Sequence, residues 1–160
     1  YPYAAAGDLA RVIPLHEAVL AHREQVLGDT HPDTLTSRSN LAYAYAWAGD
    51  LGRAIPLHEA VLAHREQVLG DTHPDTLTSR SNLAYAYAAE GDLQRAMLLY
   101  EATLVQYKQV LGDTHPDTVT CRSNLANARR AARVVQQTST ATSASDADQH
   151  PPHRAESQPQ

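Results

Sequence analysis

The sequence repeats itself every 42 residues, and this interval limits the possible folds more than any other feature. The motif Gly-Asp-Leu begins at residues 7, 49 and 91. The motif His-Pro-Asp-Thr begins at residues 31, 73 and 115. Residues 7–48 and 49–90 differ at only four positions, whereas residues 91–132 differ more but keep both motifs. Repeats of about 20 to 50 residues are typical of solenoids, in which each unit packs mainly on its neighbours. The sequence therefore predicts a stack of similar units.

Each unit carries the signals for two helices. Asp50 suits the cap before a helix over residues 51–69, and Gly70 supplies the left-handed residue that often ends a helix. Pro74 suits the first position of a second helix, which we expect to run to Glu90. Because the turns between them are short, consecutive helices must be antiparallel. The expected fold is an all-α solenoid of antiparallel helical hairpins.

Apolar residues follow the helical period in both helices of a unit. In the helix over residues 51–69, one stripe contains Leu51, Ala54, Ile55, His58, Val61, Leu62, Arg65, Val68 and Leu69. In the helix that begins near residue 32, a second stripe contains Leu35, Leu41, Ala42, Tyr45 and Ala48. We expect both stripes to be buried, because one hairpin alone hides too little apolar surface to offset its chain entropy.

The N-terminal end lies inside the repeat pattern. Residues 1–6 align with residues 43–48, so we expect them to form the last turns of an upstream helix. This alignment predicts that the chain is a fragment of a longer array, with an exposed apolar edge at this end. The predicted array covers residues 1–136, with units at 7–48, 49–90 and 91–132.

The C-terminal end of the array is predicted to be a polar cap. The third unit has Asn127 and Arg129 where the first has Tyr43 and Tyr45. Polar residues at these places are typical of a terminal repeat, which has no further unit to cover it. Residues 137–160 are polar and without periodicity, so we expect them to form a disordered tail.

Composition and charge exclude several classes of function. The net charge of -5 disfavours a nucleic-acid surface, which needs a basic face. No run of about 18 apolar residues and no secretion signal is present, so we expect a cytoplasmic protein that does not bind a membrane. The single cysteine, Cys121, cannot form an internal disulfide and is expected to be a core residue.

No pattern in the sequence predicts catalysis, a metal site or a cofactor. The nine histidines include one on each predicted loop, at residues 31, 73 and 115, but none belongs to a cluster with metal-ligand spacing. A nucleophile elbow, a phosphate-binding loop and a dinucleotide fingerprint are all missing. We therefore expect a protein that is not an enzyme.

The segment NLAYAYAWAGDLGRAIPLHEAVL, at residues 40–62, resembles the tetratricopeptide consensus. The longer unit with its LGDTHPDT loop is similar to the repeats of kinesin light chains and of bacterial arrays attached to NB-ARC-type ATPases. The resemblance covers residues 1–136 and implies a right-handed superhelix that binds a protein or peptide partner. It also implies that the first helix of each hairpin lines a concave groove, in which a matching asparagine grips a peptide backbone or a terminal carboxylate.

The candidate binding residues form a third stripe on these first helices. By their spacing and by the resemblance, the predicted peptide-binding residues are Thr36, Asn40, Tyr43, Trp47, Thr78, Asn82, Tyr85, Asn124 and Asn127. Two other interpretations remain open, namely that each amide bonds the neighbouring repeat and that the aromatic rings only pack. Few acids occur in these helices, so the sequence favours an extended acidic peptide as the ligand.

Two further functions fit the same sequence. The array could be a structural spacer that associates with itself through its N-terminal edge, or a regulatory arm of a larger signalling ATPase. The recurring arginines Arg38, Arg80 and Arg122 are expected to pair with nearby acids rather than to bind a ligand. The identity of the partner is not predicted by any feature of the chain.

Overall fold

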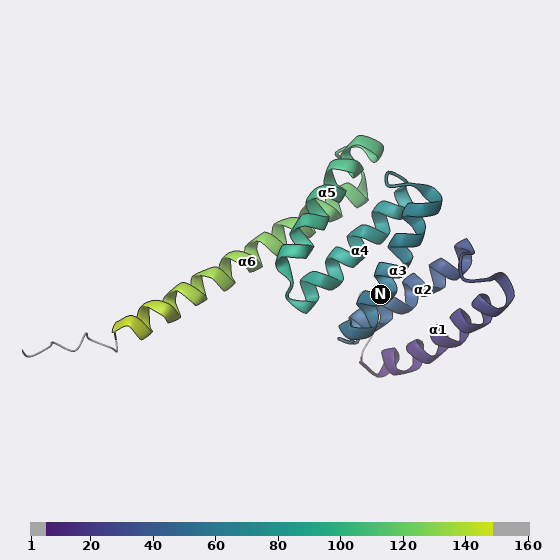
Figure 1. The fold of residues 1–160 in the computed structure, drawn as a ribbon, viewed down its shortest axis with the longest axis horizontal. Helices are drawn as coiled ribbons and strands as arrows, with labels where there is room; N and C mark the ends of the chain where they lie inside the picture. Colours follow the sequence, from purple (N-terminus) through teal and green to yellow (C-terminus); the bar gives the residue numbers. More distant parts are fainter. Residues whose placement is uncertain (1–5, 149–160) are drawn as a thin grey trace, which may run out of the picture.

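The computed structural model describes residues 6–148 and, within them, contains helices and no strands (Figure 1). The helices are α1 (Ala6–Leu27), α2 (Pro32–Trp47), α3 (Leu51–Leu69), α4 (Pro74–Glu90), α5 (Leu93–Leu111) and α6 (Pro116–Asp148). Each helix packs on the next one along the chain, and α4 also contacts α2 and α6. The predicted all-α solenoid of antiparallel hairpins is thereby confirmed.

The turns form as the sequence predicts. In addition, each loop with the His-Pro-Asp-Thr motif contains a helix cap that the sequence analysis did not predict. Asp50 accepts a hydrogen bond from the backbone N–H of Arg53 at 3.2 Å, and Gly70 has a φ of 86°. The helices α3 and α4 have the predicted bounds. Before α4, the imidazole Nδ1 of His73 accepts a hydrogen bond from the N–H of Asp75 at 3.1 Å. The same imidazole cap begins α2 and α6, so the repeated histidine has a local structural role.

The two outer helices depart from the repeat register. The helix α1 begins at Ala6, whereas the repeat register predicts a turn at Gly7. The predicted upstream helix lies mostly outside the described residues. At the other end, α6 continues to Asp148, into the segment from residue 137 for which the sequence predicts disorder. No glycine or proline interrupts the sequence from residue 117 to this point, and Arg133 and Val134 replace the Gly-Asp pair that turns the chain after α4. Residues 149–160 lie outside the described part.

The core lies along the predicted stripes, with one error at the end of α3. Its buried residues are Ala54, Ile55, His58, Val61 and Leu62, as predicted. However, Val68 is 65% exposed and Leu69 is 41% exposed. The last turn of α3 lies at the loop edge of the stack, where α2 and α4 only begin, so little covers it. In α2 the predicted residues Leu35, Leu41, Ala42 and Tyr45 are buried, whereas Ala48 is the exposed C-terminal cap.

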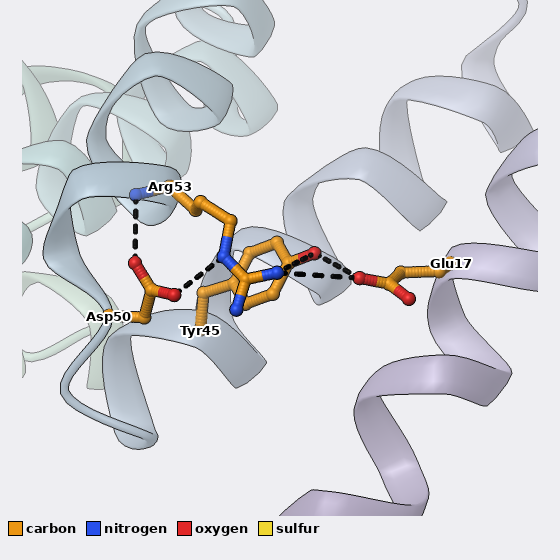
Figure 2. A network of polar contacts seen from close by, with 4 residues as sticks. All are labelled: Glu17, Tyr45, Asp50 and Arg53. Atoms are coloured by element: carbon orange, nitrogen blue, oxygen red, sulfur yellow. Dashed lines mark hydrogen bonds and ion pairs between the residues drawn. The ribbon is translucent and has the colours of Figure 1, made fainter.

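A polar network ties three successive helices together (Figure 2). The hydroxyl of buried Tyr45 in α2 donates to the carboxylate of Glu17 in α1. The guanidinium of Arg53 in α3 lies 4.1 Å from the centre of the Tyr45 ring, and it also pairs with Asp50. Burial, together with Glu17, raises the pKa of Tyr45, so its hydroxyl stays protonated. Exposed ion pairs alone contribute little, so the buried tyrosine is the main element of this network.

The network recurs once and then changes. Tyr87 donates to Glu59 at 2.6 Å, and Arg95 lies 4.2 Å from the centre of the Tyr87 ring. In the third unit Arg129 replaces the tyrosine and binds Glu101 directly at 2.8 Å. This substitution supports the predicted polar cap, because the exposed Arg129 offers no ring for a further helix to cover.

The recurring arginines pair with acids, as predicted. Arg80 is buried and donates to Glu66 at 2.6 Å and to Gln106 at 2.9 Å, so it joins α3, α4 and α5. Arg38 donates to Glu24 at 2.6 Å. In the last unit, Arg122 is more exposed and pairs with Asp113 in the preceding loop, at 3.0 Å. These contacts make the arginines structural residues of the stack.

A buried histidine makes the stability of the stack depend on pH. His58 is buried in α3, edge-on to the ring of Tyr43 at 6.4 Å between centres. Burial lowers the pKa of His58 to about 4, below its ordinary value of 6.5. The folded state therefore binds this proton less readily than the unfolded state does. The contribution of neutral His58 to the folding stability is complete above pH 6.5. It is lost as the pH falls from 6.5 towards 4.

Acidification is expected to destabilise the wild-type protein more than a His58→Tyr variant. A shift of this size corresponds to about 3 kcal/mol of unfolding free energy between pH 7 and pH 4. Tyrosine should be accommodated, because Tyr100 occupies the equivalent place in the third unit. Urea unfolding followed by circular dichroism at several pH values measures the difference. As a control, exposed His22→Gln should keep the wild-type pH dependence. Equal pH dependence of His58→Tyr and wild type would contradict the assignment.

Candidate functional site

The predicted binding residues all lie on α2, α4 and α6, and two surface hollows bring most of them together. The polar hollow has a volume of about 110 Å³, and its predicted lining residues are Tyr43, Thr78, Asn82, Tyr85 and Asn124. The apolar hollow has a volume of about 280 Å³ and includes Tyr85, Asn124 and Asn127. Asn40 and Trp47 are exposed on α2 and are not among the residues that line these two hollows. Thr36 lines a third cavity at the loop edge.

The tyrosines of neighbouring units pack on each other. The rings of Tyr43 and Tyr85 are stacked, with centres 6.3 Å apart and an angle of 5° between their planes. Burial and the neighbouring Tyr85 raise the pKa of Tyr43, whereas an interaction with the Trp47 side chain lowers it. Both Trp47 and Tyr85 remain 40% exposed. These rings therefore serve partly as packing and partly as accessible aromatic surface.

The three asparagines have different surroundings. Asn124 is half-buried, and its side chain interacts with the hydroxyl of buried Tyr100 on α5. In the described part of the chain, the side-chain amides of exposed Asn40 and half-buried Asn82 have no hydrogen-bond partner. Asn124 thus interacts with a helix of its own unit, and none of the three amides fits the alternative that each bonds the neighbouring repeat. Asn82 offers both donors and an acceptor to the polar hollow.

The residues around the apolar hollow differ from those at the equivalent place one unit earlier. Ala89 lines the hollow, together with Leu93 and Ala131 among others. One unit earlier, the residue equivalent to Ala89 is Trp47, and this is one of the four differences between the first two units. Tyr100 and Asn127 also line the hollow, and they replace His58 and Tyr85. The surface of the stack therefore changes from one unit to the next.

Four residues of the polar hollow were not among the predicted site residues, namely Ser81, Tyr107, Asp117 and Thr120. Tyr107 reaches it from α5, where its hydroxyl lies 3.2 Å from Thr78 Oγ1, and burial raises the pKa of Tyr107 to about 12. Asp117 lines the same hollow from the first turn of α6. Asp117 is the second residue of α6, so it belongs to the few acids of these helices. The recurring His-Pro-Asp-Thr motif was the signal that could have found it.

Among residues 6–148, no group of three or more His, Cys, Asp or Glu side chains could hold a metal ion. No helix in this range is long and apolar enough to cross a membrane. Cys121 is buried, and burial raises the pKa of its thiol to about 11, so it is a core residue as predicted.

Comparisons with known proteins agree with this architecture. The tetratricopeptide repeat family matches residues 36–104. A crystal structure from Podospora anserina, assigned to a kinesin light chain with nearly identical TPR-like repeats, has a TM-score of 0.74 and 34% identity. That match covers 82% of this chain and 62% of the other chain, and a point variant gives the same values. BtubC (BKLC) from P. vanneervenii has a TM-score of 0.71 and 19% identity, over 96% of this chain and 64% of that chain. The chain thus spans less than two thirds of these relatives. No curated protein matches it.

The differing surroundings of the asparagines predict different effects of their removal. Asn124→Ala should lower the unfolding free energy by about 1 kcal/mol relative to Asn82→Ala and Asn40→Ala, because only Asn124 interacts with a buried hydroxyl. All three changes raise helix propensity alike, so the difference between the variants is the informative quantity. Urea unfolding at neutral pH measures it. An equal loss in Asn82→Ala would show that this amide also has a structural role.

Proposed function

Because this chain belongs to the tetratricopeptide repeat family and its repeats are of the kinesin-light-chain type, we propose that it binds an extended peptide of a partner protein. Repeats of this family generally mediate protein–protein interactions and typically have no catalytic activity. The proposed binding surface is the face formed by α2, α4 and α6. The observation that carries the proposal is the unpartnered amide of Asn82, which lines a polar hollow beside an open apolar one.

The two hollows suit different parts of a peptide. An amide that can donate and accept is suited to pairing with the backbone of an extended chain, as proposed for Asn40 and Asn82. The apolar hollow beside Ala89 and Tyr85 is suited to one large side chain of the ligand. Trp47 and Tyr43 add an exposed aromatic surface at the α2 end. Thr78, Asn124 and Asn127 complete the proposed surface, and Thr36 lies at its rim.

The charge pattern supports an acidic ligand. Residues 34–48 and 118–136 contain no acid, so α2 and most of α6 oppose carboxylates little. Asp117 lines the polar hollow and would repel a carboxylate there. The acidic part of the peptide is therefore proposed to lie away from Asp117, and its apolar side chain over the hollow at Ala89.

Loss of the two unpartnered amides should weaken peptide binding without loss of the fold. Random peptides displayed on phage would first be selected on the wild-type protein, and the selected peptides measured by fluorescence anisotropy. Asn40→Ala with Asn82→Ala should reduce their affinity by about tenfold or more, since each lost hydrogen bond costs about 1 kcal/mol. Gln94→Ala, an exposed change on α5, is the control. Unchanged affinity in the double variant would reject this surface, and selection of basic peptides would reject the acidic preference.

A second function, self-association through α1, is supported by a difference in burial. Val61 in α3 has 0% exposure, but its equivalent Val19 in α1 is 45% exposed. Leu15 in α1 is 66% exposed, whereas its equivalent Leu57 is half-buried. The same side chains are thus covered in one helix and open in the other, as at a face that a second copy could cover.

If α1 mediates association, the mass measured by light scattering should rise with protein concentration in the wild type. Leu15→Gln with Val19→Gln should abolish this rise, because both substitutions place polar groups on the open face. Leu98→Gln is the matched control, since this residue is also 66% exposed but lies on α5. A wild-type protein that stays monomeric at all concentrations would exclude this function for the chain.

A further inference from the structure

A third cavity lies at the loop edge of the stack and belongs to neither hollow described above. Its volume is about 300 Å³, which is at the lower end of the range for small-molecule sites. Leu35, Val68 and Leu69 form an apolar wall. Arg65 and His73 add polar groups, so the cavity combines an apolar side with a cationic one.

Arg65 is a half-buried guanidinium without an acidic partner. Its Nη1 donates to the carbonyl oxygen of Asp75 at 3.2 Å and to Ser79 Oγ at 2.8 Å. Among the described residues no carboxylate forms an ion pair with it, in contrast to Arg80, which pairs with Glu66. Burial lowers the pKa of Arg65, an effect that nearby Asp75 opposes. A partly desolvated cation with unused donors favours an anionic ligand.

His73 and Thr36 place further groups around the same cavity. Because His73 Nδ1 accepts a hydrogen bond from the backbone, the proton of the neutral ring lies on Nε2, which can donate. The hydroxyl of Thr36 donates to the carbonyl of Pro32 at 2.9 Å, so its lone pairs are left to accept. The cavity thus has two donors, on Arg65 and His73, beside its apolar wall.

In the next unit the equivalent place lacks the guanidinium. Tyr107 replaces Arg65 there, and its hydroxyl lies 3.2 Å from Oγ1 of Thr78, the equivalent of Thr36. Each of these two hydroxyls is thus the hydrogen-bond partner of the other. The cationic cavity is therefore a property of the interface between the first two units and not of the repeat in general.

We infer that this cavity binds a carboxylate carried on a short apolar stem. The carboxylate would meet Arg65 and His73, and the stem would pack on Leu35, Val68 and Leu69. Two sources share this chemistry, namely a free short-chain carboxylic acid and an apolar C-terminal residue of a protein. The inference goes beyond the peptide-binding face, because the cavity is lined from the loop edge and only Thr36 is common to both.

Asp75 limits the charge of the ligand. Asp75 also lines the cavity, and its carboxylate would repel an anion. A ligand with one negative charge and an apolar stem therefore fits better than phosphate or a dicarboxylate. Asp75→Asn would remove this repulsion while it keeps the backbone carbonyl that accepts from Arg65.

Titrations of the isotope-labelled chain by nuclear magnetic resonance test the inference. The probes are 4-methylpentanoate, N-acetyl-leucine and, as a neutral control, N-acetyl-leucinamide. Both acids should shift the backbone amides of Thr36, Val68, Leu69 and His73, and the neutral amide should not. Binding of N-acetyl-leucine alone would identify a peptide terminus as the source, whereas tighter binding of 4-methylpentanoate would identify a free acid.

Exchange of the two equivalent residues gives matched variants. Arg65→Tyr copies the third unit, so it should fold and lose binding by about tenfold or more. Tyr107→Arg should create a second set of shifts near Thr78, and Asp75→Asn should tighten binding. Equal binding of the neutral amide, or acid binding that survives in a folded Arg65→Tyr variant, would overturn the inference. Asn40→Ala with Asn82→Ala should leave these titrations unchanged, so a failure here is separate from a failure of the peptide-binding face.

Discussion

The apolar face of a helix in this stack is covered most completely where helices lie against it on both sides. Residues 13–27 and 55–69 have the same sequence, yet Val61 in the second segment is fully buried and Val19 in the first is not. Burial of one large apolar side chain is worth about 1.5 to 3 kcal/mol, so the neighbouring helices decide the stability of each segment. The polar hollow, the apolar hollow and the cavity at the loop edge depend on the same stacking, since each of these three has walls from more than one helix.

Much of the fold could be predicted from single residues, because the turns are determined locally. Asp50 and Gly70 mark the ends of α3 through their own backbone and side-chain chemistry, and the helix has the expected bounds. The end of α6 could not be predicted in this way. Polar composition indicated disorder there, but without glycine or proline the helix continues. The exposed Val68 was also missed, because helical periodicity does not tell where the covering helices begin.

The candidate site was predictable only as a stripe of residues on one kind of helix. Its spacing placed Asn82 and Asn124 on one face, and that placement does not reveal that one amide is engaged and the other free. Tyr107 and Asp117 come from α5 and from the start of α6, and only the stacking of units brings them beside Thr78. The features that distinguish the surface arise where the units differ, at Trp47 and Ala89, and at Arg65 and Tyr107. The positions that are identical among the repeats form the common helical stack. The few positions that differ make its surface change from one unit to the next.

The helix α6 continues past the place where the chain turns after α4, and this continuation does not depend on the number of units before it. A Gly-Asp pair turns the chain after α4, and Arg133 with Val134 carries it on as helix at the equivalent place. A duplicated 42-residue block inserted between α2 and α5 would therefore add a hairpin with matching neighbours on both sides, and it would leave the final helix as it is. Such an array can lengthen or shorten by whole units during evolution, and each product keeps the same α6.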